Sequence, residues 1–532
     1  MQKCLYAGVS AAITATSASV RRPISTSAAR RWRNFENERH YEPGEDPFGR
    51  IKHALMYDFR RAKRRYNEAK YDAFRRLYPI AHMKREPQDY ELLPFRTDFL
   101  IIGGGLTGSA TAFWLKEGFR DESLTVVVVE NNDVFTKSRS MLGSGVISQQ
   151  FAVPEMVEMS QYTAEFLRHA GEHLKILDND PPDINLLPVN FLHLVDTSER
   201  AEKLKETWKM QVSKGVHVAY LTQDELRAKF PFMNFDEITA GSLGLENEGV
   251  FDTWQLLSAL REKNQTLGVR YVKGEVESFD FYRDKYIPQD FGYADIQEAE
   301  SLASARLRLR GANVRIQMTG ASARPIRCYQ MINAAGPWAG EIASRLGIGS
   351  GPGLMSVPMP IVCTRRTNFV VHAPEVPALD MPALVDASGV FCRPDSVGYN
   401  FICGRSPTRK DIVKKDDDAD DEVNYDSFYD EIYPFLVKRA PAFKNAKVIN
   451  AWNSYEDANT FDDAPILGEH LLYDTFYTMA GFGGYGAQLS IAAGKLYSER
   501  AYDQAYSTIN VRGFDMRRIM QGQRVDEPLR AV

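Results

Sequence analysis

Hydrophobic and polar residues recur with two different spacings along the chain, and the change of spacing marks where its main body begins. Over residues 49–78 apolar side chains return every three or four positions, which predicts an amphipathic helix. From residue 95 onward the pattern becomes a short apolar strand, a glycine turn, a helix and a second strand. No apolar run approaches the length of a bilayer span, which argues against an integral membrane protein.

The glycine turn has the spacing of a dinucleotide fingerprint. It joins a predicted strand at 97–102 to a predicted helix at 109–116, and it contains Gly103, Gly105 and Gly108. The first glycine permits a tight turn, the second lets a pyrophosphate approach the backbone, and the third lets helix and strand pack closely. The N-terminus of the helix offers free N–H groups and a positive dipole end to the phosphates.

The second strand, at 124–129, ends at Glu130. A carboxylate at this point can accept hydrogen bonds from ribose hydroxyls and would repel a 2′-phosphate, so NADP is disfavoured. The order strand, glycine turn, helix, strand and acid favours a nucleotide site over a purely structural βαβ unit.

The loop at 138–145 follows closely, and its small and hydroxyl residues, Ser140 among them, suit close approach of a phosphate. The alternative is an ordinary turn.

Composition narrows the class of protein. The chain has 532 residues, of which 44% are hydrophobic and 25% charged, as in globular proteins of two or three domains. The net charge of -5 gives no nucleic-acid signature, so no nucleic-acid partner is expected. The five cysteines form neither a CxxC pair nor a Cys/His cluster, so we expect no metal site and a reducing compartment.

Two basic segments precede the main body. Residues 1–35 are rich in arginine and serine and lack acidic residues, which is typical of a mitochondrial transit peptide; the alternative is a basic tail without function. The helix predicted at 49–78 contains ten basic residues and three acidic ones. Such a helix could bind the inner membrane peripherally or a partner protein, or it could pack on the enzyme body.

Further motifs resemble the D-amino-acid-oxidase group of FAD-dependent amine oxidoreductases, which includes glycine oxidase and sarcosine oxidase. They are EGVFD at 248–252, GEV at 274–276, NAAGPWA at 333–339, DAPILG at 463–468 and GFGGYG at 481–486. The resemblance covers about residues 97–500. It implies a mixed α/β (α+β) fold, in which a Rossmann-type FAD-binding domain is interleaved with an antiparallel-sheet substrate domain.

The resemblance also implies the domain boundaries. The transit peptide (1–35) and a basic helical extension (36–94) precede the oxidoreductase body (95–505), and a tail at 506–532 wraps around the body or frays. The FAD-binding segments are expected at about 97–190, 240–345 and 448–500, and the substrate-domain segments at about 190–240 and 346–447.

The same resemblance places further residues at the cofactor. The backbone at Val276 would meet the adenine, and Gly336 and Trp338 would lie in the turn that closes the FAD domain. Gly481, Gly483 and Gly486 would return the chain to the flavin. There the positive end of a helix at 487–498 could stabilise reduced flavin, or the helix could simply begin against a strand. No His or Cys occurs at 138–151 or 481–490, so FAD is expected to be noncovalent.

Catalytic residues are harder to assign. Relatives often have a histidine within the last glycine motif, where this chain has Tyr485, and a neutral phenol cannot act as a histidine does. Amino-acid oxidases hold the substrate carboxylate with arginine. Arg393 is our candidate for that contact, although a surface salt bridge is the alternative. Trp452 and Tyr455 could line a pocket or pack in a core.

The leading hypothesis is oxidation of a secondary amine or amino acid by hydride transfer to flavin N5. Residues 146–151 and the overall layout resemble mitochondrial members of the group that are associated with assembly of respiratory complex I. This closer resemblance implies a place on the matrix side of the inner membrane and complex I subunits or assembly intermediates as partners. The alternatives are an FAD-bound assembly factor or scaffold without turnover, and an NAD-dependent dehydrogenase.

Overall fold

The computed structural model describes residues 62, 66, 70, 93–119, 123–283, 307–317, 322–351, 353–395, 398–413, 422–525 and 527. The chain divides into two compact units, Met1–Phe74 and Arg75–Val532. In the first unit only Ala62, Tyr66 and Lys70 are described, and all three are helical and exposed. The transit peptide at 1–35 and the rest of the basic helix at 49–78 lie outside the described residues.

The first sheet has seven strands and is the frame of the dinucleotide fold. In pairing order they are β1 (Arg96–Ile102), β2 (Val126–Glu130), β9 (Arg270–Arg283), β10 (Leu307–Ile316), β11 (Arg324–Asn333), β18 (Tyr473–Ala480) and β17 (Ile466–His470). β1 lies in parallel between β2 and β11. The start of β9 continues the parallel sheet beside β2, and its remainder forms an antiparallel meander with β10 and β11.

Helices cover both faces of this sheet, which explains why its inner strands are apolar at nearly every position. Successive side chains of a strand point to opposite faces. Phe99 and Ile101 accordingly pack in a core with residues of α16 (Gly486–Asp503), while Leu100 and Ile102 pack in another with residues of α13 (Ala339–Arg345). The β1–α5–β2 unit, with α5 at Leu106–Gly118, is therefore held rigidly from both sides.

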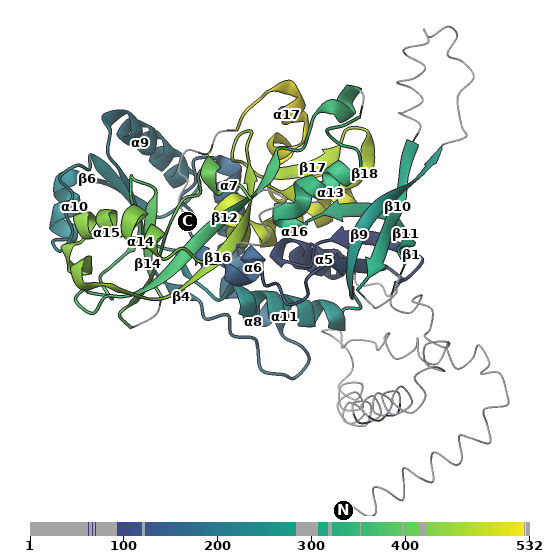
Figure 1. Cartoon of the computed structure of the whole chain (residues 1–532), viewed down its shortest axis with the longest axis horizontal. Helices are drawn as coiled ribbons and strands as arrows, with labels where there is room; N and C mark the ends of the chain where they lie inside the picture. The colour runs from purple at the N-terminus through teal and green to yellow at the C-terminus, as the bar shows by residue number, and fades with distance from the viewer. Residues whose placement is uncertain are drawn as a thin grey trace, which may run out of the picture. The chain divides into compact units, whose positions relative to one another are not determined.

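The remaining helices connect or cover the sheets (Figure 1). They are α6 (Arg139–Leu142), α7 (Pro154–Arg168), α8 (Ala170–Leu174), α9 (Ser198–Ser213), α10 (Gln223–Lys229), α11 (Thr253–Thr266), α14 (Asp426–Glu431), α15 (Tyr433–Arg439) and α17 (Arg517–Gln521). Short 3-10 turns are η1 (Gly336–Trp338), η2 (Gly353–Ser356), η3 (Arg409–Asp411), η5 (Pro441–Asn445), η6 (Gly483–Tyr485) and η7 (Arg512–Phe514).

The second sheet has eight strands and lies on the left in Figure 1. In pairing order they are β16 (Lys447–Asn459), β12 (Ile361–His372), β15 (Asn400–Arg405), β14 (Val390–Pro394), β13 (Ala383–Val385), β5 (Phe191–Val195), β7 (Ala240–Gly244) and β6 (Val218–Thr222). All neighbours are antiparallel except β13 and β5. A small third sheet joins β3 (Val146–Ile147), β8 (Gly249–Val250) and β4 (Leu187–Pro188).

The mixed fold class predicted from the sequence, a Rossmann-type domain interleaved with a largely antiparallel one, is confirmed. Two strands nevertheless lie in the second sheet although the sequence assigned them to FAD-binding segments. β7, at the start of 240–345, pairs with β5, and β16, at the start of 448–500, pairs along its length with β12. The alternation of residues within a strand does not reveal its pairing partner, which explains both differences.

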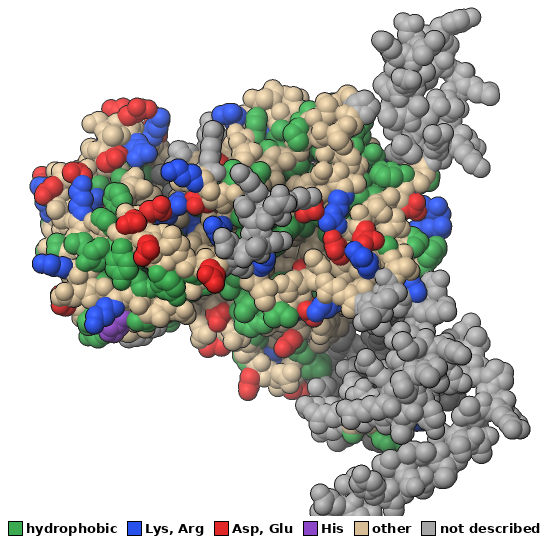
Figure 2. Space-filling model, in the orientation of Figure 1, with side chains coloured by type: hydrophobic (Ala, Val, Ile, Leu, Met, Phe, Trp, Pro, Cys, Tyr) green, Lys and Arg blue, Asp and Glu red, His purple; other side chains and the backbone are tan. Residues whose placement is uncertain are grey.

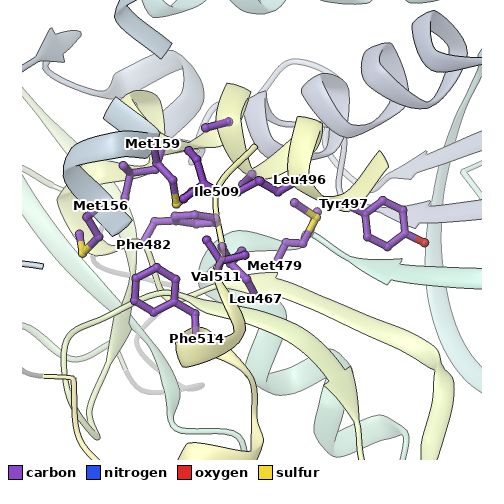
Figure 3. Packing of buried hydrophobic residues seen from close by; sticks show 14 of the residues in the cluster. Met156, Met159, Leu467, Met479, Phe482, Leu496, Tyr497, Ile509, Val511 and Phe514 are labelled. Atoms are coloured by element: carbon purple, nitrogen blue, oxygen red, sulfur yellow. The ribbon is translucent and has the colours of Figure 1, made fainter. Parts of the chain in front are cut away.

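The C-terminal segment wraps around the body as far as it is described. Ile509, Val511 and Phe514 are buried in the core beneath α7 and α16 (Figure 3). Arg518 then makes a buried two-point ion pair with Asp462, at 2.7 and 3.1 Å. The described part of this segment therefore packs on the body, as the wrapping alternative predicts.

The surface seen in Figure 2 has acidic and basic side chains interspersed over the described residues. Apolar side chains gather over α14 and α15, where Tyr425, Tyr429 and Phe435 are exposed. No helix within the described residues combines the length and apolarity needed to cross a membrane.

Candidate functional site

The glycine turn after β1 brings three backbone segments very close together. Gly103 has a φ of +102°, and a Cβ there would lie 2.3 Å from the carbonyl oxygen of Ala334. A Cβ on Gly108 would lie 1.9 Å from the carbonyl oxygen of Gly103. The first and third glycines are therefore required by backbone packing. Gly105 differs because it is the N-cap of α5, and its Cβ would meet Ser140 Oγ at 2.8 Å.

A cavity of about 420 Å³, the first cavity, opens at this turn. The N-terminal ends of two helices, α5 and α16, contribute to its wall, so positive dipole ends and free N–H groups lie beside it. The predicted cofactor residues on its wall are Gly103, Gly105, Glu130, Ser140, Gly336, Trp338, Gly483 and Gly486. Segments far apart in sequence thus meet at one cavity.

Glu130 is held in place at the end of β2. Its carboxylate accepts hydrogen bonds from the N–H groups of Gly104, at 2.7 Å, and Asn132, at 2.8 Å. Burial raises the pKa of Glu130 above its ordinary value, and these backbone hydrogen bonds oppose the rise. The carboxylate is therefore oriented by the turn and lies on the cavity wall, where ribose hydroxyls could reach it.

Three predicted cofactor residues do not line the first cavity. Gly108 packs against the glycine turn, and Gly481, with a φ of +81°, borders a neighbouring cavity. Val276 is buried, and its carbonyl oxygen accepts a hydrogen bond from Arg345. From its strand, Gly274 and Glu275 line the cavity instead.

Asp457 on β16 is a wall residue of the first cavity that the sequence analysis missed. Its carboxylate accepts hydrogen bonds from the N–H groups of Gly481, at 2.7 Å, and Phe482, at 3.0 Å. Burial raises the pKa of Asp457 to about 7. Asp457 thus fixes the last glycine turn against the second sheet. Its position in an ordinary strand pattern gave no signal of this role.

A second cavity of about 440 Å³ adjoins the first and shares Phe482 and Gly483 with it. Alternate residues of β12 and β16 form part of its wall, as the two-residue period of a strand requires. Tyr485 also lines this cavity, and its ring meets that of Phe151 edge-on with centroids 5.0 Å apart. Tyr485, which stands where relatives have a histidine, therefore lines the second cavity and not the first.

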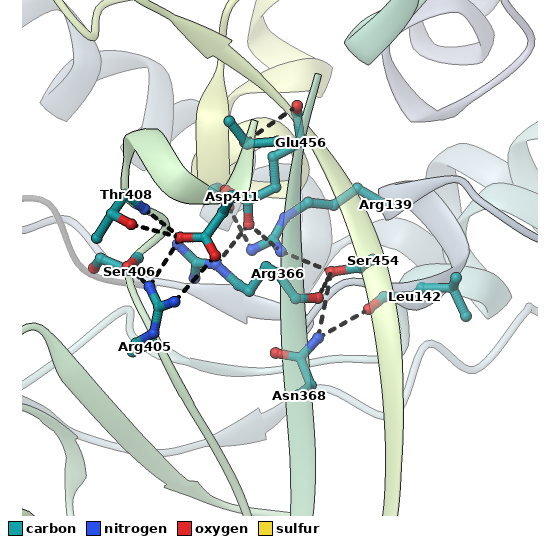
Figure 4. A network of polar contacts seen from close by, with 12 residues as sticks. Arg139, Leu142, Arg366, Asn368, Arg405, Ser406, Thr408, Asp411, Ser454 and Glu456 are labelled. Carbon is teal, nitrogen blue, oxygen red and sulfur yellow. Dashed lines mark hydrogen bonds and ion pairs between the residues drawn. The ribbon is translucent and has the colours of Figure 1, made fainter. Parts of the chain in front are cut away.

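A buried charge network joins the two cavities (Figure 4). Glu456 Oε1 lies 2.7 Å from Arg366 Nε and 2.5 Å from Arg139 Nη1. Arg139 also donates a hydrogen bond to the carbonyl oxygen of Gly484, at 3.2 Å. Arg366 and Glu456 line the second cavity, whereas Arg139 lines the first. The network ties the wall of one cavity to that of the other.

The structure does not place Arg393 at the site. Its strand, β14, lies two positions from β12 in the second sheet, and Arg393 lines neither cavity. Arg393 donates to the carbonyl oxygen of Pro394 and lies 3.7 Å from Asp395, and burial lowers its pKa to about 10. The prediction of a substrate contact at Arg393 is therefore wrong for these two cavities, and the arginine on the wall of the second cavity is Arg366.

The two aromatic candidates also lie off the walls of both cavities. Trp452 donates a hydrogen bond from Nε1 to the carbonyl oxygen of Leu142, at 2.9 Å, and Tyr455 is buried. Both are packing residues of β16. Among the described residues no group of His, Cys, Asp and Glu side chains could hold a metal ion.

Comparison with known proteins gives a consistent result. A family model described as FAD dependent oxidoreductase (DAO) matches residues 98–500. The FAD-dependent oxidoreductase domain-containing protein 1 of Xenopus laevis is 36% identical over 432 residues, which cover 80% of this chain and 83% of that protein.

Two solved structures share the fold at low sequence identity. The L-proline dehydrogenase from P. horikoshii has a TM-score of 0.62 and 19% identity, with 81% of this chain and 100% of that chain covered. The glycine oxidase from Geobacillus kaustophilus has a TM-score of 0.59 and 19% identity, with 79% and 98% covered. At these identities the likeness concerns the fold.

Proposed function

The chain belongs to the DAO family of FAD-dependent oxidoreductases, and from this premise we propose that it oxidises a secondary amine or amino acid by hydride transfer to FAD. The observation that supports this function best is the pair of adjoining cavities. The first has the lining of a dinucleotide site, and the second has both polar and apolar residues on its wall and shares Phe482 and Gly483 with the first. A cofactor in the first cavity and a substrate in the second could therefore meet at that shared wall.

The residues of the first cavity fit FAD. A Cβ at Gly105 would collide with Ser140, so the close approach of backbone to a pyrophosphate depends on that glycine. Glu130 suits the ribose, and the N-terminal ends of α5 and α16 suit negative charge. No His or Cys is among the residues that line the cavity, so FAD is held noncovalently.

The chemistry that bound FAD supplies is acceptance of a hydride at N5 from the carbon next to the substrate nitrogen. The chain itself positions and shields the reactants. Asp457 holds the turn at Gly481 in place, and the N-terminus of α16 favours negative charge beside that turn. Phe482 and Tyr485 are buried and limit the access of water at the shared wall.

Anaerobic titration of the purified full chain tests this function. Secondary amines and amino acids are added in turn, and bleaching of the visible flavin absorbance by at least one of them is expected. The rival function is that of an FAD-bound assembly factor without turnover. If dithionite bleaches the flavin and no amine or amino acid does so, the oxidase proposal is wrong and the rival stands.

We also propose that the protein works in mitochondria, on the matrix side of the inner membrane. The acid-free, arginine-rich composition of residues 1–35 supports import. These residues fused to a fluorescent protein should direct it to mitochondria. Diffuse cytosolic fluorescence would refute this part of the proposal.

We also propose that residues 49–78 bind the inner membrane peripherally and so hold the protein at its surface. Near an anionic surface each basic side chain contributes on the order of 1 kcal/mol. Salt should release the protein from mitochondrial membranes, and a variant with Arg60, Arg61, Arg64 and Arg65 changed to glutamine should stay soluble while keeping its FAD. Equal sedimentation of variant and parent would show that the helix only packs on the enzyme body.

A role in assembly of respiratory complex I completes the proposal. It is supported by the resemblance of residues 146–151 and of the overall layout to complex I-associated members of the family. Loss of the protein should lower the amount of assembled complex I on native gels, and the full chain should restore it. An unchanged amount of complex I after loss would contradict this role.

A further inference from the structure

The second cavity contains an arginine that is already paired with a carboxylate of the protein itself. Arg366 and Glu456 are almost completely buried, with side-chain exposures of 4% and 3%, and their closest atoms lie 2.7 Å apart. Thr364 pairs with Glu456 in the register of β12 and β16, so Arg366 lies diagonally across from Glu456 on the same face. The ion pair is therefore built into the sheet.

Glu456 also has a second guanidinium partner. Arg139 lies 2.5 Å from the same carboxylate oxygen, and it is anchored by the carbonyl oxygen of Gly484. A substrate carboxylate that reached Arg366 would have to compete with Glu456, and displacing Glu456 would leave a buried carboxylate with fewer partners. Loss of an ion-pair partner by a buried charge is unfavourable. The arginine is accordingly poorly suited to hold an amino-acid substrate.

The charged groups around the cavity balance once Arg139 is counted. The charged residues of the wall are Arg366, Glu456 and Asp463, and Arg139 contacts the same oxygen of Glu456 from the first cavity, so two guanidiniums accompany two carboxylates. Ser406 also lines the cavity, and its buried Oγ has no hydrogen-bond partner among the described residues (Figure 4). A hydroxyl oxygen of this kind can accept a hydrogen bond from an N–H group. The wall thus offers an acceptor to an N–H group, whereas both guanidiniums beside it already have a carboxylate partner.

We propose that Glu456 takes, from within the chain, the place on Arg366 that an amino-acid carboxylate would occupy, so that the cavity selects an amine without a carboxylate. This inference rests on the proposed amine oxidation and narrows its substrate class. The nitrogen of the amine lies toward Asp463 and Ser406, and its apolar part lies toward Phe482 at the shared wall.

Binding of two small probes of similar shape and opposite charge tests the inference on the FAD-loaded full chain. The probes are isopropylammonium and isobutyrate, and the readouts are calorimetric heat and the shift of the flavin spectrum. The parent protein should bind isopropylammonium more tightly than isobutyrate. This comparison needs no variant, so it does not depend on the folding of a mutant.

Glu456→Gln should reverse the preference because it releases the guanidinium of Arg366 for an anion. Isobutyrate should then bind about tenfold tighter or more, which is the effect of one charge-assisted hydrogen bond. The matched control is Asp386→Asn. Asp386 forms a buried ion pair with Arg439, and neither residue lines either cavity. The control should bind both probes as the parent does.

The inference would be overturned if the parent protein bound isobutyrate and Arg366→Gln weakened that binding. Glu456→Gln with retained FAD and no gain in isobutyrate binding would also overturn it. Failure of the proposed oxidation is a separate result, since it appears as a flavin that no amine bleaches, whatever the charge preference of the cavity.

Discussion

Gly105→Val is the substitution that most sharply separates the fold from cofactor binding. A Cβ at Gly105 would lie 2.8 Å from Ser140 Oγ, and the branched methyl groups would project beside a wall of the first cavity. Overpacking of this kind costs about 1–3 kcal/mol of fold stability, because the clash with Ser140 is present without FAD. Loss of one charge-assisted hydrogen bond to a phosphate costs about 1.5–3 kcal/mol of binding free energy. FAD affinity should therefore fall roughly tenfold to a hundredfold.

The assay is titration of apoprotein with FAD, followed by the quenching of flavin fluorescence. Circular dichroism of the apoprotein shows whether the variant is folded. The matched control is Gly513→Val, because a Cβ at Gly513 would meet no atom within 4 Å. The control should bind FAD as the parent does.

The outcome that would refute the reasoning is a folded Gly105→Val protein with the FAD affinity of the parent. The pyrophosphate would then lie elsewhere, and the glycine turn would be only a packing feature. An equal loss of affinity in Gly513→Val would show that the effect is general destabilisation.

Three further predictions concern charges. Glu130→Gln should weaken FAD binding by about 1–3 kcal/mol, measured by calorimetry, because a charged acceptor for ribose hydroxyls is lost. Arg518→Ala should lower the free energy of unfolding in urea by about 3–5 kcal/mol, because Asp462 stays buried without its ion pair. Arg517→Ala, an exposed neighbour, should change it by less than about 0.5 kcal/mol. Burial raises the pKa of Glu248 from its ordinary value of 4.5 to about 7, so its contribution to stability is complete below pH 4.5 and is lost as pH rises through 7. Urea unfolding across this range should show a decline that is about 3 kcal/mol smaller in Glu248→Gln than in the parent, while the decline due to Asp457 remains in both.

Each of these predictions has a contrary result. Unchanged FAD affinity in Glu130→Gln would place the ribose away from β2. Equal effects of Arg518→Ala and Arg517→Ala would mean that the buried ion pair does not hold the C-terminal segment. Parallel pH profiles for the parent and Glu248→Gln would show that another group titrates.

The nucleotide fingerprint could be predicted because its parts are close in sequence. Strand period, glycine spacing and the acid after the second strand are local signals, and the structure places Gly103, Gly105 and Glu130 on the first cavity as that pattern implies. The family motifs extended the prediction to Gly336 and Gly483, which reach the same cavity from distant parts of the chain.

The substrate side could not be predicted in the same way. Arg366, Arg393 and Glu456 all lie in strands, and a two-residue period shows which residues share a face but not which face meets a cavity. Pairing of β12 with β16 brings Arg366 to Glu456, whereas the position of β14 removes Arg393. Only the order of strands in the second sheet separates these two arginines.

The central claim is that the first cavity holds FAD noncovalently, and acid precipitation of the purified full chain tests it most directly. The account predicts a yellow protein whose entire flavin appears as FAD in the supernatant, close to one molecule per chain. A flavin that stays with the precipitate would contradict noncovalent binding. A colourless protein that takes up NAD and not FAD would contradict the assignment of the cavity itself.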